Sequence, residues 1–104
     1  MIVDVRCYTI QPRKMKTYLK IFEEDGLPVQ QRNGLKLLGY FVHSVGRLNR
    51  VTHMWEFDSL ADMEQKRAAR DADPGWAEYQ AKTDGLVQAQ ENSLTTPAPF
   101  SPIK

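Results

Sequence analysis

The sequence predicts an α+β domain in which helices cover one face of a single antiparallel sheet. The chain has 104 residues, enough for one hydrophobic core and too few for two domains. Its composition, with 41% hydrophobic and 26% charged residues, is typical of a globular protein in water. Segments with strand and helix periodicity follow one another in the order β-α-β-β-α-(α)-β. We therefore expect one domain over residues 1–104.

The first strand is predicted at residues 2–10, IVDVRCYTI, where β-branched residues alternate with period two. Arg6 and Tyr8 lie on its polar face. The opposite face, which we expect to meet the helices, carries small apolar side chains, namely Val3, Val5 and Cys7. Cys7 is the only cysteine, so we expect a buried small hydrophobe in a reducing compartment.

An amphipathic helix is predicted next. Its apolar stripe has the spacing i, i+3, i+4 and i+7, made by Met15, Tyr18, Leu19 and Phe22. Because proline cannot donate to the carbonyl four residues before it, Gly26 and Pro28 predict an end or a kink near Gly26. A short helical turn should continue to about Arg32 and stop at Asn33 and Gly34.

Two strands, residues 35–45 and 50–57, are predicted to form a hairpin around the short loop GRLN. If Val45 faces Val51, one face of the hairpin carries the aromatic and imidazole side chains, namely Phe41, His43, His53, Trp55 and Phe57. A slip of one residue would move every side chain to the other face of the sheet.

Ser59 is the predicted N-cap of a helix from about Leu60 to Arg70, with its hydroxyl accepting from the amide of Asp62. Acidic residues stand early in this helix and basic residues late, as the helix dipole favours. We expect Arg67 and Arg70 to be solvated.

Asp73 and Pro74 predict the start of a further helix, with the aspartate as N-cap. Its aromatic residues, Trp76 and Tyr79, should anchor it on the covered face of the sheet. A last strand is predicted within residues 86–96. The three prolines of residues 97–104, PAPFSPIK, exclude a regular strand and predict an extended tail.

This order of elements is the ferredoxin-like split βαβ, which leaves one face of the sheet without helices. On the predicted register, that face carries Arg6, Tyr8, Phe41, His43, His53 and Trp55. An exposed aromatic surface of this size marks an interaction site. A second copy of the chain, packed sheet against sheet, would close a barrel around a cavity, so we predict a homodimer.

The central residues resemble the NIPSNAP family of the dimeric α/β-barrel superfamily. The matching stretch is LLGYFVHSVGRLNRVTHMWEFDSLADMEQKRAAR followed by DPGW, and the ends DVRCYTIQPRKM and ENSLTTPAPFSP are also similar. The resemblance implies a dimeric α/β barrel without implying a settled reaction. The family pattern has an arginine where this chain has Met63. If that arginine serves a site, its role falls here to Arg67 or to no residue.

Two functions are compatible with the predicted surface. In the first, the protein binds a small apolar or aromatic molecule through Phe41, His43, Trp55 and Phe57, or the same residues only hold a structural dimer. In the second, the protein is a cofactor-free monooxygenase or isomerase acting on a quinol-like or enolisable substrate. In that enzyme His53 is the general base, and Arg6 and Tyr8 stabilise negative charge on the substrate.

Other classes have weaker support. His43 and His53 could share a metal ion or one could ligate haem, but the predicted strands offer no third metal ligand, so we expect no metal and no cofactor. The net charge of +1 and the lack of a basic stripe argue against nucleic acid. No stretch is apolar for long enough to insert into a membrane, and no signal peptide is evident, so we expect a cytoplasmic protein.

Overall fold

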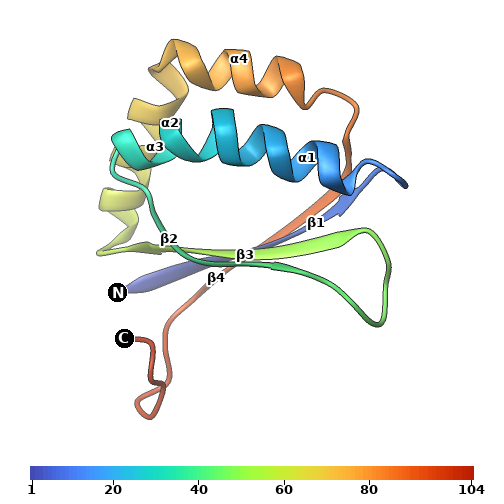
Figure 1. Ribbon diagram of the computed structural model, residues 1–104. Helices are drawn as coiled ribbons and strands as arrows, with labels where there is room; N and C mark the ends of the chain where they lie inside the picture. The colour runs from blue at the N-terminus through green and yellow to red at the C-terminus, as the bar shows by residue number, and fades with distance from the viewer.

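Four strands form one antiparallel sheet in the computed structural model, which describes residues 1–104 (Figure 1). They are β1 (Ile2–Ile10), β2 (Lys36–Val42), β3 (Arg50–Phe57) and β4 (Val87–Thr95). Their order across the sheet is β2-β3-β1-β4, so the first and third strands are central. This is the topology of the split βαβ fold, and the predicted fold class is confirmed.

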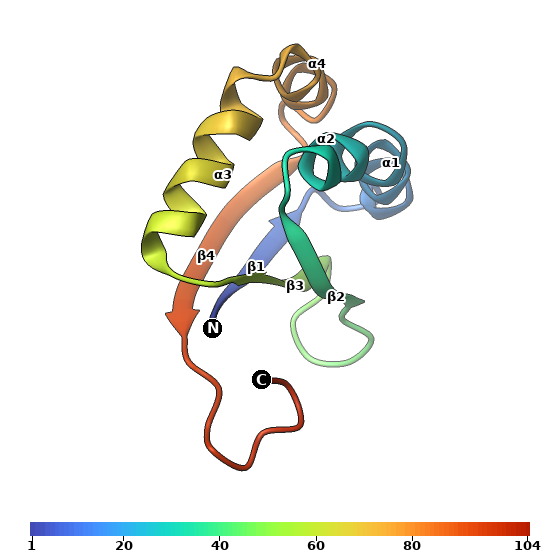
Figure 2. The same cartoon turned by 90° about the vertical axis from the view of Figure 1, so that its left-hand side faces the viewer.

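All helices lie on the same side of the sheet. The first helical segment consists of α1 (Met15–Ile21), the π-helical turn η1 (Phe22–Gly26) and α2 (Leu27–Arg32). The second consists of α3 (Leu60–Ala72) and α4 (Pro74–Lys82). Figure 2 shows these helices together above the sheet, whereas the β2–β3 loop and the C-terminal tail lie away from them. None of the helices is long and apolar enough to cross a membrane.

The chain stays helical through the predicted break near Gly26. The π-helical turn places one extra residue in the rod immediately before α2, and Pro28 lies in the first turn of α2, where its missing amide hydrogen costs least. The helix therefore absorbs the proline by widening one turn. Asn33 and Gly34 end it as predicted, with Gly34 at a φ of 85°.

Both predicted N-caps are confirmed. The Ser59 hydroxyl accepts from the amide of Asp62 at 3.1 Å, and the Asp73 carboxylate accepts from the amide of Gly75 at 2.9 Å. The Asp62 side chain accepts in turn from the amide of Asp58 at 2.9 Å. The boundaries of α3 and α4 are thus set by side-chain chemistry that is visible in the sequence.

The predicted register of the β2–β3 hairpin is wrong. Val51 pairs with Val42 instead of Val45, and the connecting loop spans residues 43–49. The offset is three residues, an odd number, and an odd offset moves a whole strand's side chains to the other face. A left-handed backbone at Gly46 and Asn49, with φ of 98° and 62°, lets the longer loop turn back.

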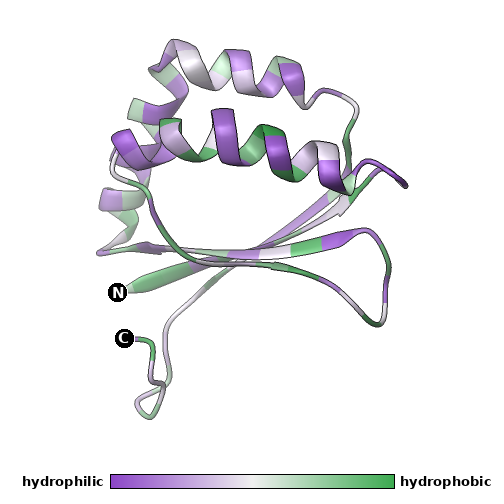
Figure 3. Cartoon of the chain, viewed as in Figure 1, coloured by the Kyte–Doolittle hydropathy of each residue, from purple (hydrophilic) through white to green (hydrophobic).

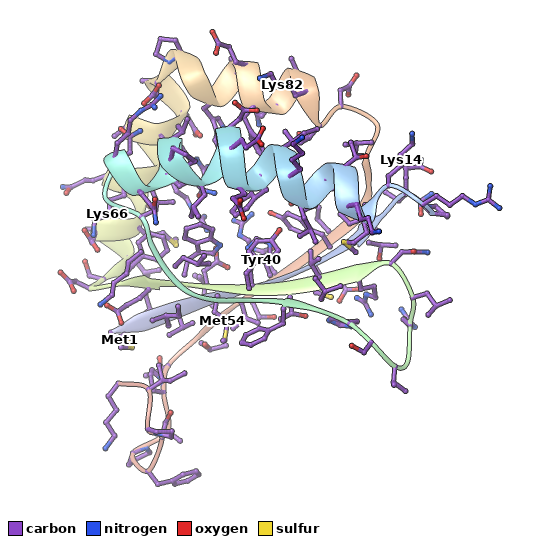
Figure 4. The ribbon with its side chains drawn as sticks, viewed as in Figure 1. Met1, Lys14, Tyr40, Met54, Lys66 and Lys82 are labelled. Carbon is purple, nitrogen blue, oxygen red and sulfur yellow. The ribbon has the colours of Figure 1, made fainter.

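As a result, the hairpin places its aromatic residues on two different faces. Tyr40 pairs with His53, and both side chains face the helices, whereas Phe41 pairs with Thr52 on the uncovered face. Figure 4 shows Tyr40 on the helix side of the sheet and Met54 on the other side.

The faces of β1 are also opposite to those predicted. Arg6 lies opposite His53 and Asp4 lies opposite Trp55, so the polar side of this strand meets the helices. Cys7, expected beneath the helices, lies opposite Thr52 on the uncovered face and is half-buried. Polar residues tolerate burial here because they form hydrogen bonds and ion pairs with one another.

The core between sheet and helices consists of two groups of buried side chains. The larger group is Phe22, Leu35, Trp55, Phe57, Met63 and Tyr79, and the smaller is Ile10, Tyr18 and Val51. Hydrophobic and polar residues alternate along each helix in Figure 3, as expected for helices with one buried side. After β4 the chain leaves the sheet on the face opposite the helices and forms no further helix or strand.

Candidate ligand-binding site

A cavity of about 490 Å³ lies between the covered face of the sheet and the helices. Strands β1 and β3 supply its floor, and η1, α3 and α4 supply most of its walls and roof. The cavity therefore lies within a single chain, and the prediction that it lies on the uncovered face of the sheet is wrong. The cause is the reversed facing of β1 and β3, which turns their polar and aromatic residues toward the helices.

The structure brings five of the seven predicted site residues together in this cavity, namely Arg6, Tyr8, His53, Trp55 and Phe57. The other two lie elsewhere. Phe41 is 54% exposed on the uncovered face, and Nε2 of His43 lies 2.6 Å from the hydroxyl of Thr52. His43 and His53 are therefore on opposite faces of the sheet and cannot share a metal ion.

Trp55 fixes the chemical state of His53. The indole N–H of Trp55 donates to Nδ1 of His53 at 2.7 Å. An indole nitrogen can only donate, so Nδ1 must be the accepting, unprotonated nitrogen, and a neutral ring carries its hydrogen on Nε2. His53 is only 3% exposed, and Nε2 has no hydrogen-bond partner.

Aromatic rings enclose the imidazole of His53. Tyr40 stacks on it with the ring centroids 4.6 Å apart, and Tyr8 meets it edge-on at the same centroid distance. Burial, and after it the positive charge of Arg6, lowers the pKa of His53 from 6.5 to about 4. His53 is therefore neutral at pH 7 and offers one hydrogen-bond donor. This geometry argues against His53 as general base, because Trp55 already occupies the nitrogen with the free lone pair.

A buried carboxylate, Asp4, is the centre of the polar part of the site. Asp4 is 1% exposed, and its Oδ2 accepts from Nε of Arg6 at 2.8 Å and from the guanidinium of Arg67 in α3. Arg6 also donates from Nη1 to the Tyr8 hydroxyl at 3.0 Å. The second carboxylate oxygen, Oδ1, is buried and has no partner. Two arginines therefore share one oxygen of one carboxylate.

Asp4 and Arg67 were not among the predicted site residues. Arg67 was expected to be solvated, but its side chain reaches the cavity and is only 25% exposed. Two signals pointed to them. Asp4, Arg6 and Tyr8 alternate with apolar residues along the first strand, and the resemblance named Arg67 as the residue that would take over the role of an arginine absent at Met63.

The charge around the cavity is positive on balance. Arg6, Arg67 and Arg70 line it, together with the carboxylates of Asp4 and Asp71. Burial, followed by the charge of Arg6, lowers the pKa of Arg67. This environment favours a ligand that brings a negative or partly negative oxygen to the guanidinium groups.

The aromatic part of the site lies above and beside this polar group. The Trp76 and Tyr79 rings of α4 lie 4.9 Å apart, and Arg70 lies over the Trp76 ring at 4.5 Å. The prediction that Arg70 is solvated is therefore wrong, because its guanidinium packs on the Trp76 ring. The ring of Phe22 meets Trp55 and Tyr79 edge-on, so aromatic side chains line both the sheet side and the helix side of the cavity.

The fold and this cavity define a small α+β domain with an internal pocket between sheet and helices. The chain belongs to the NIPSNAP family, whose family model matches residues 3–102. The predicted resemblance is confirmed. Among curated relatives, it is 29% identical over 103 residues to human Protein NipSnap homolog 3A and 30% identical over 101 residues to Drosophila melanogaster Protein NipSnap. It spans 41% and 36% of their lengths, respectively, and 97% of its own length is matched in each.

Solved structures of bacterial relatives have the same architecture. Protein Atu4242 of Agrobacterium tumefaciens, described as a NIPSNAP family protein of unknown function, is 35% identical, with a TM-score of 0.95 over all of both chains. An uncharacterised NIPSNAP domain protein of Burkholderia xenovorans is 29% identical, with a TM-score of 0.92 over 98% of this chain and 99% of that chain. A structure described as an antibiotic biosynthesis monooxygenase shares only the fold, at 14% identity and a TM-score of 0.66 over 95% of this chain and all of that one.

Proposed function

We propose that this protein binds a small aromatic molecule in the cavity between its sheet and its helices. The main support for this proposal is the lining of the cavity, in which aromatic rings surround a few convergent polar groups. Its volume of about 490 Å³ is within the range typical of small-molecule pockets. Burying arginines and a carboxylate beside aromatic rings costs more free energy than filling the same volume with apolar residues. Their presence therefore indicates a binding function instead of a purely structural one.

Tryptophan signals test this proposal directly. The chain has two tryptophans, Trp55 and Trp76, and both line the cavity. Titration with small phenols and aromatic ketones should shift both indole N–H resonances, with dissociation constants in the millimolar to micromolar range, roughly −4 to −8 kcal/mol. Phe41→Ala on the uncovered face is the matched control and should leave the titration unchanged. Shifts confined to Phe41 and His43, with none at either indole, would place binding on the wrong face and contradict the proposal.

We also propose that the protein is a homodimer formed through the uncovered face of the sheet. This face has no helical cover and carries half-buried or exposed apolar side chains, including Cys7, Phe41 and Met54. Such a surface is stabilised when a second copy covers it. Sedimentation at micromolar concentration should show a dimer, and Met54→Lys should shift it toward monomer. Leu60→Lys, at an exposed position in the first turn of α3, should leave the dimer intact.

A second candidate function is a cofactor-free monooxygenase or isomerase acting on a quinol-like or enolisable substrate. The observation that favours it is the excess of guanidinium over carboxylate at Arg6 and Arg67, which would stabilise an oxyanion formed during turnover. In this role Arg6 and Tyr8 keep the electrostatic functions that the sequence predicts, whereas His53 is unsuited to be the base. Turnover of a quinol in air should fall by about a hundredfold in Arg67→Gln. Equal rates in Arg67→Gln and the unmodified protein would exclude this enzyme.

A further inference from the structure

We propose that the cavity selects aromatic molecules carrying a hydroxyl group and a separate oxygen acceptor, with Asp4 Oδ1 accepting from the hydroxyl and His53 Nε2–H donating to the acceptor. This inference rests on the proposed binding function and specifies its ligand class. It also assigns the hydrogen-bond-accepting position of the site to Asp4, which was not among the predicted site residues.

The two oxygens of the Asp4 carboxylate have different surroundings. Both arginines bind the same oxygen, Oδ2, and leave Oδ1 buried without a partner. A buried acceptor without a hydrogen bond costs free energy, and a carboxylate oxygen is among the strongest acceptors in a protein. The remaining polar neighbour on the strand, Tyr8, accepts from Arg6 and is not bonded to Asp4. Oδ1 therefore favours a hydrogen-bond donor supplied from outside the chain.

His53 has the opposite property, because it carries a buried donor without an acceptor. Trp55 holds Nδ1 as an acceptor, so the hydrogen of the neutral ring is on Nε2. That nitrogen is buried and has no partner. Tyr40 and Tyr8 contact the ring by its face and its edge without forming a hydrogen bond to it. His53 therefore offers a donor that requires an acceptor from outside the chain.

Asp4 and His53 lie close enough to contact one ligand. Asp4 and His53 belong to neighbouring cross-strand pairs, Asp4 with Trp55 and Arg6 with His53, on the same face of the sheet. Such diagonal neighbours lie roughly 7–8 Å apart at the backbone, so a ligand of the size of one aromatic ring, lying above the strands, can contact both side chains. Both residues line the same cavity. One ligand with a donor at one end and an acceptor at the other would therefore satisfy both orphaned groups.

The charged neighbours are compatible with this assignment. Arg6 and Arg67 face Asp4 from β1 and α3, and both donate to its Oδ2, which leaves Oδ1 as the oxygen able to accept from a ligand. They also give the site a positive surplus that stabilises negative charge on a bound hydroxyl oxygen. An apolar ring without oxygen substituents would leave all of these groups without new partners.

A series of four related ligands tests the proposal on the unmodified protein. The probes are para-hydroxyacetophenone, para-methoxyacetophenone, para-ethylphenol and para-ethylanisole, which have both polar groups, only the carbonyl acceptor, only the phenolic hydroxyl, and neither. Titrations followed by the indole N–H resonances are made below the pKa of the phenols, so that each hydroxyl keeps its hydrogen. We expect para-hydroxyacetophenone to bind about tenfold more tightly than either singly altered probe, the ratio that one lost buried hydrogen bond gives.

Substitution of Asp4 tests whether this residue causes the preference for a ligand that carries a hydroxyl group. Asp4→Asn keeps the size of the side chain and removes its charge, so the ratio of affinities between the hydroxy and methoxy ketones should shrink severalfold. The matched control, Asp84→Asn, changes an exposed carboxylate after α4 that lies outside the cavity, and it should preserve the ratio. The ligand series on the unmodified protein remains decisive if Asp4→Asn fails to fold.

The outcomes separate this inference from the function on which it rests. If all four probes bind with equal affinity, water satisfies Asp4 and His53, and the assignment is wrong while the binding function stands. If none of them shifts either indole resonance, the binding function itself fails and the assignment fails with it. A preference for the methoxy ketone over the hydroxy ketone would also overturn the role of Asp4.

Discussion

The indole of Trp55 donates to the imidazole of His53 at 2.7 Å, and these two residues stand two apart on the same strand. Period two places both side chains on the covered face of the sheet, beneath the helices. The contact joins the aromatic core to the polar part of the cavity. It also decides what His53 can do, because the nitrogen left free is a donor and not a base.

Breaking this contact should change the tautomer of His53. In Trp55→Phe, Nδ1 loses its donor while the ring stays buried, and we expect a loss of about 1–3 kcal/mol in the free energy of unfolding from the unpaired nitrogen. Nitrogen NMR of the unmodified protein should show Nε2 protonated and Nδ1 bare at pH 7. In the variant the two tautomers should mix. Trp76→Phe is the control, and it should leave the His53 nitrogen signals unchanged.

The buried state of His53 predicts a specific dependence of stability on pH. The pKa is lowered from 6.5 to about 4 on folding, so between these values the unfolded chain binds a proton that the folded protein does not. The contribution of the neutral, buried His53 to stability is therefore fully present above pH 6.5 and is lost as the pH falls through this window. The total loss attributable to His53 is about 3 kcal/mol.

Urea denaturation at several pH values above 4 measures this loss. The pKa values of Asp62 and Asp73 are lowered by their hydrogen bonds, so their contributions are lost below this window. His53→Gln should flatten the dependence between pH 6.5 and 4, whereas His43→Gln on the other face should preserve it. A steep decline that persists in His53→Gln would assign the effect to another group.

The sequence was sufficient for the fold because each element carries a local signal. The alternation in β1, the caps at Ser59 and Asp73, and the apolar stripe of α1 all act over a few residues, and the structure confirms them. The hairpin register depends instead on where the chain turns. The sequence predicts the short loop GRLN, but the turn uses residues 43–49. Because of this difference, Phe41 and His43 lie outside the site.

The site was only partly predictable for a related reason. The assumption that apolar residues face the helices placed Arg6 and Tyr8 on the wrong side of the sheet. Burial of charge in this fold depends on contacts between distant residues, such as Arg67 in α3 with Asp4 in β1, which no local pattern records. The residue types were still informative, because charged residues within an apolar strand marked the strand that forms the cavity floor.

Asp73 connects α4 to the end of the first helical segment, and its loss should lower thermal stability. It accepts two hydrogen bonds from Arg32, at 2.7 and 2.6 Å, and one from Asn33 at 2.9 Å, besides capping its own helix. Asp73→Ala should therefore lower Tm more than Asp71→Ala, which removes a carboxylate bonded only to the adjacent Arg70. Calorimetry of both variants is the measurement. Equal shifts in Tm would show that the contacts to Arg32 and Asn33 contribute little.

Gly26 should be required for the position of Tyr79. A β-carbon at Gly26 would lie 2.6 Å from Cε1 and 2.9 Å from Cζ of the Tyr79 ring, which is buried against Phe22 and Trp76 and cannot move aside freely. Gly26→Ala gains about 1 kcal/mol of helix propensity. Overpacking of the core costs about 1–3 kcal/mol, so we expect a net loss of stability in urea denaturation.

The same substitution should reverse its sign when the ring is removed. In the Tyr79→Leu background the clash disappears, and Gly26→Ala should become neutral or stabilising by up to about 1 kcal/mol, the helix propensity alone. The interaction energy between the two sites comes from the four unfolding free energies of the double-mutant cycle. If Gly26 packs closely on Tyr79, the double variant should be more stable than the sum of the two single substitutions predicts. Purely additive effects would mean that the π-helical turn adjusts to the extra methyl group and that Gly26 is not needed to seat the ring.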